Sequence, residues 1–240
     1  RKNGYLYMEK RKHTVDERLS KEKESKGKLK LANSIAGKLE KIPTVLFIGV
    51  SVNLAMMNSD KNDDIDFFVI TSANTAWITR LLLIAYLKAL GRHRKRGDKN
   101  VKDRICLNMI IDERSLRIPK NMQNLYTAHE IAQLKALIQK NNVYKKFITS
   151  NKWVNKFLPN ALEELRIQAE DLKKTQASRF GVFLLSFPIL EKLVQFVQQI
   201  LIKRNITRET IKNNFIALHP KDYNSIILDH YSKKLYKYGL

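Results

Sequence analysis

Two aspartates in the first third of the chain, Asp64 and Asp66, have a type and spacing suited to holding a metal ion. They belong to the run Asp64-Ile65-Asp66-Phe67-Phe68-Val69-Ile70, which is predicted to be a strand, and residues i and i+2 of a strand point to one face of its sheet. Two like charges at that separation are unfavourable unless a cation lies between them. Mg²⁺ takes carboxylate oxygens and keeps positions open for phosphate oxygens. We therefore predict that Asp64 and Asp66 are a catalytic pair that binds Mg²⁺ or Mn²⁺, the alternative being two solvated acids where a strand begins.

A second pair of residues, Gly49 and Ser51, ends the preceding predicted strand. A glycine permits close approach of a ligand to the backbone, and a hydroxyl with the N–H groups of a helix start can hold a phosphate. A phosphate cradle at one strand end and an acid pair on the next strand together predict phosphoryl or nucleotidyl transfer.

These two motifs carry a resemblance to a known family. The run Phe47-Ile48-Gly49-Val50-Ser51, followed by Asp63-Asp64-Ile65-Asp66-Phe67-Phe68-Val69-Ile70, resembles the nucleotidyltransferase superfamily, the group with DNA polymerase β-like catalytic domains. The resemblance covers residues 43 to about 112. It implies that Asp64 and Asp66 bind Mg²⁺ and that Gly49 and Ser51 contact a nucleoside triphosphate. One departure is Val50, because the family usually has its glycine and serine adjacent.

The third carboxylate of the family is the larger departure. The family places it on the strand after the intervening helix, and here that segment runs from Asp103 to Asp112 with Asn108 at the mid-strand position. An amide can ligate a metal through its oxygen, but it carries no charge and cannot act as a base. We assign Asn108 to the position of the missing acid, with Asp103 and Asp112 as alternatives that require a shifted register. The competing hypothesis is a catalytically impaired protein that keeps this fold and binds nucleic acid.

The charge balance points to a polyanionic partner. The 240 residues hold 45 Lys+Arg against 23 Asp+Glu, a formal net charge of +22, yet four acids cluster at Asp60, Asp63, Asp64 and Asp66. A basic run before the third predicted strand supplies the expected nucleic-acid contacts, Arg92, Arg94, Lys95 and Arg96. The expected partners are a nucleoside triphosphate and a nucleic acid, RNA ahead of DNA, although a solvated loop is the usual fate of a charge run.

The elements that must position these residues follow from apolar patterning. Strands are expected over 44–48, 64–70 and 105–111. Helices are expected over 15–39, 53–57 and 77–90, the last closed by Gly91 at a C-cap position, and then over 123–139, 142–156, 159–175, 181–203, 207–214 and 222–237. The predicted fold class is α/β: a leading charged helix (1–42) that packs on a small mixed-sheet nucleotidyltransferase core (43–118), followed by a mostly helical domain (119–240).

Three further features limit the possibilities. The apolar stretch 181–202 contains Glu191 and Pro188, and its apolar side chains follow a helical period, so we predict a buried helix and no membrane span, with a peripheral membrane protein as a weaker alternative. A single cysteine, Cys106, excludes a disulfide framework, fits a reducing, cytoplasmic location, and is expected to be a small core residue. Trp153 and Phe157 alternate with basic residues and are expected to pack into the core.

Together these features predict a Mg²⁺-dependent nucleotidyltransferase. It would move a nucleoside monophosphate from a nucleoside triphosphate to an acceptor hydroxyl, with RNA as the expected acceptor. Asp64 and Asp66 would hold the metal, and Gly49 and Ser51 would hold the triphosphate.

Overall fold

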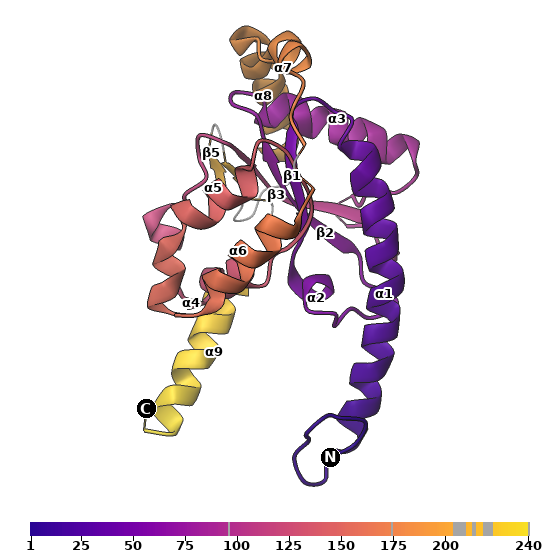
Figure 1. The fold of residues 1–240 in the computed structure, drawn as a ribbon, viewed down its shortest axis with the longest axis vertical. Coiled ribbons are helices and arrows are strands. Elements are labelled where there is room, and N and C mark those ends of the chain that lie inside the picture. The colour runs from indigo at the N-terminus through magenta and orange to yellow at the C-terminus, as the bar shows by residue number, and fades with distance from the viewer. Residues whose placement is uncertain (96, 174, 204–209, 213–214, 218–222, 240) are drawn as a thin grey trace.

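The fold is described by a computed structural model that covers residues 1–240 except 96, 174, 204–209, 213–214, 218–222 and 240. The described residues form a mixed β-sheet with the strand order β4-β1-β2-β3-β6-β5, with helices packed on it (Figure 1). The predicted α/β class is therefore confirmed.

Three consecutive strands form the centre of the sheet: β1 (Val45–Val50), β2 (Ile65–Thr71) and β3 (Ile105–Asp112). β1 is antiparallel to β2, and the short helix α2 (Val52–Ala55) lies between them in the chain. β2 is parallel to β3, which requires a crossover, and α3 (Ala76–Ala89) provides it. Gly91 follows α3 with a φ of 64°, as expected of a C-cap glycine. The three strands and two helices expected between residues 44 and 111 are confirmed.

The edges of the sheet come from the C-terminal half of the chain, and here the sequence prediction is partly wrong. The helix expected over 123–139 ends early: α4 covers Leu125–Ala132, and Lys135–Gln139 form β4, antiparallel to β1. A strand is favoured because the outer edge of β1 carries backbone groups that need partners. On the other side β6 (Phe215–Ala217) pairs with β3, and β5 (Thr210–Lys212) pairs with β6. The helix expected over 207–214 is therefore wrong at β5, and the rest of that range lies outside the described residues.

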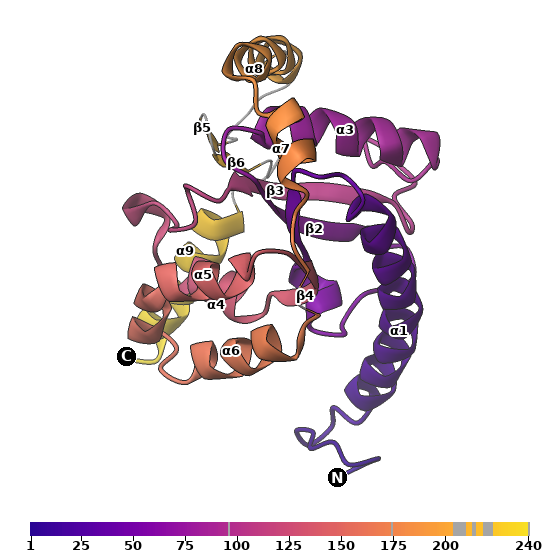
Figure 2. The same ribbon diagram turned by 45° about the horizontal axis from the view of Figure 1, so that its top comes forward.

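Each face of the sheet buries its own hydrophobic core. On β2, Phe67 and Val69 pack toward α1 (His13–Leu39) and α3, whereas Phe68 and Ile70 pack toward α4, α5 (Val143–Ser150) and α6 (Ala161–Asp171). Figure 2 shows α1 and α4–α6 on opposite sides of the sheet. Because side chains alternate along a strand, Asp66 shares the face of Phe68, which α4–α6 cover.

The leading helix α1 is confirmed, and it also braces the loops around the acid pair. Its buried Lys28 donates a hydrogen bond to the backbone oxygen of Asp63 (2.7 Å) and forms an ion pair with Asp103 (2.8 Å). The loops that lead into β2 and β3 are thus tied to one ammonium group.

The connections around α4 and α5 include two short 3₁₀ helices. η1 (Lys120–Met122) precedes α4, and the helix expected over 142–156 is divided into α5 and η2 (Lys152–Lys156). The expected helix near 159–175 is confirmed as α6, and the last one is α9 (Tyr223–Lys237), which packs against α4.

The apolar stretch near residue 190 is not the single buried helix that was expected. It forms α7 (Arg179–Leu185) and α8 (Pro188–Lys203), because the chain breaks before Pro188. The apolar side chains of the predicted stripe are exposed, for example Ile189 (85 %) and Phe196 (63 %), whereas the polar side chains of Glu191 and Gln198 are buried against α3.

Within the described residues, no individual helix has the length and apolarity needed to cross a bilayer, although α7 and α8 together pass that test as a pair bent by 58°.

The division into segments 1–42, 43–118 and 119–240 stays a prediction. The third segment contributes β4, β5 and β6 to the common sheet.

Candidate metal and nucleotide site

The two predicted aspartates lie together where β2 begins. Asp64 immediately precedes the strand, and Asp66 is its second residue. One ligand atom each from Asp64, Asp66 and Cys106 lies within 4.8 Å of the other two. This group could hold a metal ion.

The electrostatics of the pair are unfavourable without a cation. The pKa of Asp66 is raised to about 7, first by burial and second by the neighbouring charge of Asp64. Burial also raises the pKa of Asp64, although the nearby Arg94 guanidinium opposes that shift. Two half-buried carboxylates whose charged forms are both disfavoured are the arrangement that a divalent cation would relieve. The residues therefore fit a hard cation such as Mg²⁺.

Arg94 neutralises part of this charge. Its guanidinium donates a hydrogen bond to Asp64 Oδ2 across 2.6 Å, and both side chains are half-buried. Arg94, which was expected to contact nucleic acid, thus reaches into the acid pair from the loop before β3.

The residue beside Asp66 on the neighbouring strand is Cys106. The parallel register pairs Asp66 with Cys106, so the position next to the acid pair holds a thiol. Burial and the charge of Asp66 raise the pKa of the Cys106 thiol, which keeps it protonated, and it hydrogen-bonds Asp66. Cys106 is only half-buried, so the expected core role is wrong. A neutral sulfur is a poor ligand for Mg²⁺, which leaves the two carboxylates as the hard ligands here.

Asn108 lies one step further along the same face of the sheet. The register between β2 and β3 shifts after the pair Phe67 and Leu107, and Phe68 is opposite Met109, so Asn108 has no direct partner on β2. Its side-chain amide donates to Ser51 Oγ at 3.5 Å, and it is buried. Asn108 is therefore brought to Ser51 and lies beyond the acid pair.

Gly49 and Ser51 are engaged with the protein itself. A Cβ at Gly49 would come within 3.0 Å of the Lys135 carbonyl oxygen and within 2.9 Å of the Phe47 ring, so the sheet alone already requires glycine there. The backbone N–H of Ser51 donates to the Asp66 carbonyl oxygen at 3.1 Å, which leaves its hydroxyl as the group that could face a ligand. The next residue, Val52, has a φ of 55°, an unusual conformation for a β-branched residue.

A carboxylate that sequence reasoning missed, Glu130, faces this region from α4. It lines a small cavity of about 30 Å³, enough for a water molecule, together with Ser51 and Asn108. Burial raises the pKa of Glu130 to about 6, and its charge contributes to the raised pKa of Asp66. Tyr126, one helical turn earlier, donates a hydrogen bond to Glu130 Oε1 at 3.2 Å. The sequence signal was the i, i+4 spacing of Tyr126 and Glu130, which has no chemical meaning until the helix is placed over the sheet.

The other acids considered for the third position point elsewhere. Asp103 pairs with the buried Lys28 of α1. Asp112 is fully buried at the far end of β3, where it accepts hydrogen bonds from the backbone of Asn74 and from Arg114. Both carboxylates therefore stabilise loop conformations, and neither faces the acid pair. Among the described residues, the metal-binding group at β2 includes no third carboxylate.

The rest of the basic run is mixed in its placement. Arg92 is half-buried and its guanidinium lies 3.5 Å from the Asp103 carbonyl oxygen, whereas Lys95 is exposed. Arg96 lies outside the described residues.

Comparisons with known proteins name no family. No family model and no curated protein matches the chain. A solved structure described as a toxin-antitoxin with AMP-PNP shares 18 % sequence identity, and the match covers 57 % of this chain and 96 % of that one with a TM-score of 0.33. A likeness this distant carries no argument about this chain.

Proposed function

We propose that this protein is a divalent-metal-dependent nucleotidyltransferase that moves a nucleoside monophosphate from a nucleoside triphosphate to an acceptor hydroxyl. The observation that carries the proposal is the convergence of Asp64 and Asp66, both with raised pKa values, on one face of a mixed sheet. A protein that keeps two half-buried acids side by side loses stability by doing so, and a cation that handles phosphate is the simplest reason to keep them.

Asp64 and Asp66 would hold Mg²⁺, which when bound would neutralise charge on the triphosphate. Ser51 would offer its hydroxyl to a phosphate oxygen, and Asn108 orients that hydroxyl through its amide. Arg94 donates a hydrogen bond to Asp64, and its guanidinium would also suit a phosphate oxygen of the triphosphate.

Glu130 is the candidate base. Its Oε1 accepts a hydrogen bond from the Tyr126 hydroxyl. Its Oε2 would take the proton from the hydroxyl group of the acceptor molecule, which would enter beside Ser51. A carboxylate with a pKa of about 6 is mostly ionised at neutral pH and still basic enough to accept a proton as the hydroxyl attacks.

The test is nucleotide transfer by a double variant, Asp64→Asn with Asp66→Asn. The wild-type protein is incubated with Mg²⁺ or Mn²⁺, each of the four labelled triphosphates, and with or without RNA. Loss of both metal ligands removes several kcal/mol of transition-state stabilisation, so transfer should fall by at least about 10³-fold. The control is Asp60→Asn, a nearby exposed acid whose ion pair is with Lys21 of α1. Equal transfer by the double variant and the control contradicts the assignment.

A second candidate function is a nucleic-acid-binding protein on the same fold that performs no transfer. Two observations favour it. The position opposite Asp66 on β3, where a third carboxylate would lie closest to the acid pair, holds the thiol of Cys106. In addition, the charge of Asp64 is already neutralised by its ion pair with Arg94. The same assay decides between the two, because this alternative predicts no incorporation with any triphosphate although RNA is bound.

A further inference from the structure

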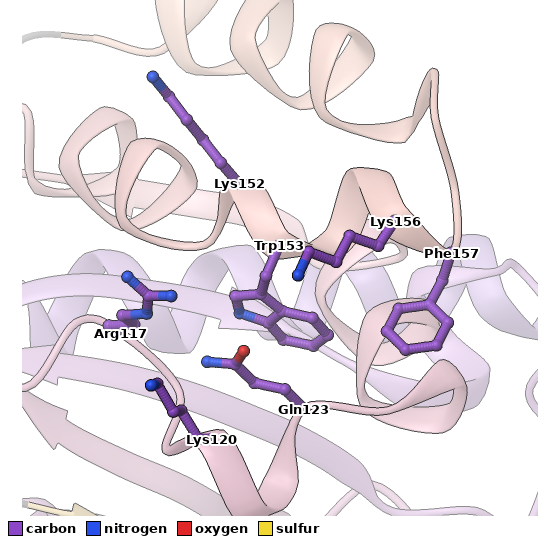
Figure 3. Close-up of a pocket in the computed structure, with 7 residues that line it drawn as sticks. All are labelled: Arg117, Lys120, Gln123, Lys152, Trp153, Lys156 and Phe157. Carbon is purple, nitrogen blue, oxygen red and sulfur yellow. The ribbon is translucent and has the colours of Figure 1, made fainter.

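A basic pocket that shares no residue with the acid pair lies on the helical side of the molecule. Its volume is about 660 Å³. The side chains that line it come from the loop after β3, from η1 and its C-cap, and from η2 and the residue that follows: Arg117, Lys120, Gln123, Lys152, Trp153, Lys156 and Phe157. Figure 3 shows the Trp153 indole in the middle of the group, with Arg117, Lys120 and Lys156 around it and Lys152 extending away.

One buried amide fixes the two walls of this pocket. The Asn151 side chain accepts hydrogen bonds from the backbone N–H of Ile118 (3.0 Å) and from Trp153 Nε1 (2.9 Å). Its amide nitrogen donates to the carbonyl oxygens of Leu116 (2.8 Å) and Phe147 (2.9 Å). The loop that carries Arg117 is thereby held against η2, so the pocket is a formed feature of the fold.

The charge of the pocket is of one sign. Four cations line it, and within the part of the chain that the structure describes none of them forms an ion pair, nor does any carboxylate line the pocket. Like charges held together without counter-charges attract an anion. By contrast, two arginines of the basic loop before β3 form ion pairs: Arg94 with Asp64, and Arg104 with Asp98.

The aromatic lining distinguishes the kinds of anion. Trp153 is only 6 % exposed, as expected of a core residue, and packs edge-on against Phe157. The prediction that Phe157 also packs into the core is wrong, because this residue is 41 % exposed. An exposed ring beside several cations suits a ligand that alternates phosphates with flat bases, and such a ring serves any base because every base has a π-face. A duplex hides its bases, so the ligand class is a single strand.

The pocket is also close to the candidate site. Arg117 lines the pocket, and the next residue, Ile118, lines the small cavity that Glu130 also lines. On the other side, Gln123 lies two residues before α4, the helix that carries Glu130. We propose that this pocket binds a single-stranded nucleic acid, with its phosphates on the four cations and a base on Phe157. That the bound strand is the acceptor of the transferred nucleotide rests on the proposed function, whereas the binding does not.

The first experiment measures binding of a fluorescein-labelled single-stranded 12-nucleotide RNA by anisotropy across a salt series, without metal or triphosphate. Lys152→Ala with Lys156→Ala should weaken binding at least tenfold and reduce the magnitude of the slope of log K against log salt by about 1.4, the value for two single-strand phosphate contacts. The matched control is Lys145→Ala with Lys146→Ala, which removes two exposed charges from the neighbouring helix α5 and none from the pocket. Equal weakening by both double variants would show only the general attraction of a basic protein and overturn the proposal.

The second experiment tests the stacking ring. Phe157→Ala should weaken binding about tenfold with an unchanged salt slope, and Phe157→Tyr should restore it, because stacking does not release counterions. Thermal unfolding of each variant identifies any loss of fold. Unchanged affinity in a folded Phe157→Ala protein, or displacement of the RNA by polyglutamate as readily as by unlabelled RNA, contradicts the proposal.

A third comparison separates this proposal from the proposed function. The Asp64→Asn, Asp66→Asn protein should bind the RNA with wild-type affinity and the same dependence on Lys152 and Lys156. RNA binding through the pocket without nucleotide transfer by the wild-type protein would remove the proposed function and leave the pocket. Nucleotide transfer by the wild-type protein, together with RNA binding that the pocket substitutions do not weaken, would remove the pocket proposal and leave the proposed function.

Discussion

At the scale of single residues, the chemistry depends on how the environment changes a few carboxyl groups. Asp66 and Glu130 come from different elements, and burial raises the pKa of both. The consequence differs for each. Asp66 is unfavourable as a lone anion and suits a metal ligand, whereas Glu130 is poised to exchange a proton near neutral pH.

The raised pKa of Asp66 predicts how the stability of the metal-free protein depends on pH. The native state binds this proton more tightly than the unfolded chain does, so the free energy of unfolding should fall as the pH rises from about 4 to about 7 and then level off. Asp66→Asn should remove the part of this dependence that comes from Asp66 and leave the part that comes from Asp64 and Glu130, and it should raise the free energy of unfolding at pH 8 by up to about 4 kcal/mol. Urea unfolding at several pH values, with and without Mn²⁺, measures both effects. A wild-type protein that becomes more stable over this pH interval without metal would contradict the prediction.

Glu130 has a separate signature in the pH profile. Glu130→Gln should lower kcat by about 10²- to 10⁴-fold and leave the Mn²⁺ affinity unchanged, because a base acts on the acceptor and does not hold the metal. Tyr126→Phe should move the acidic limb of the wild-type profile upward from about 6, since the hydrogen bond that is lost holds the pKa of Glu130 down. Steady-state transfer from pH 5 to 9 and Mn²⁺ titration test both statements. A Glu130→Gln protein that loses metal affinity in parallel with kcat would make Glu130 a ligand instead.

At the scale of elements, three tertiary features assemble the site on the sheet: the packing of α1, the position of α4 and the register of β3. Lys28 of α1 ties down the loops before β2 and β3, and α4 places Glu130 over the face that Asp66 shares. The register shift within β3 then decides that Cys106 is opposite Asp66 while Asn108 reaches Ser51. Each contact joins residues far apart in the chain.

The packing of α8 on α3 reverses the usual amphipathic arrangement. The buried carboxylate of Glu191 accepts hydrogen bonds from the backbone N–H groups of Trp77 (2.8 Å) and Ile78 (2.9 Å) at the first turn of α3. Gln198 donates to the Trp77 carbonyl oxygen at 2.8 Å. Glu191 thus caps a helix from another element, where a negative charge also favours the helix dipole.

This cap predicts a loss of stability that apolar packing would not. Glu191→Ala should lower the free energy of unfolding by about 2 kcal/mol, because two N–H groups of α3 lose their acceptor, and Glu191→Gln should cost less because one acceptor oxygen remains. The control is Glu163→Ala on α6, an exposed acid that pairs with Arg166. Urea unfolding monitored by circular dichroism measures all three variants. An equal cost for the Glu191 and Glu163 substitutions would show that the cap contributes nothing.

At the scale of the whole molecule, the charge of +22 is unevenly organised. The acids gather where β2 begins, and the cations near them are used: Lys28, Arg94 and Arg104 each pair with an aspartate. Within the described residues, cations without such partners line the pocket between η1 and η2. Net charge therefore indicates a polyanionic ligand, but only the pairing of individual groups indicates where it would bind.

The local elements of the first half were predictable because each is encoded by neighbouring residues. The buried strands, the crossover helix with Gly91 and the i, i+2 spacing of Asp64 and Asp66 are all properties of short windows. The errors lie in the second half. The segment 135–139 is short and only partly apolar, and it forms a strand because it pairs with the open edge of β1. The prediction of a buried helix near residue 190 failed because the apolar face of α8 points away from the rest of the protein.

By itself, the sequence determined the α/β class, the basic character and the pair of carboxylates on one strand face, since composition and period-two alternation are local. Tertiary structure alone decided that Cys106 lies beside Asp66, that Glu130 faces Ser51 and Asn108, and that Asp103 and Asp112 are committed to loops. The physical reason is that strand register and helix placement minimise the free energy of the whole core. A short window contains only a few of the contacts that set them.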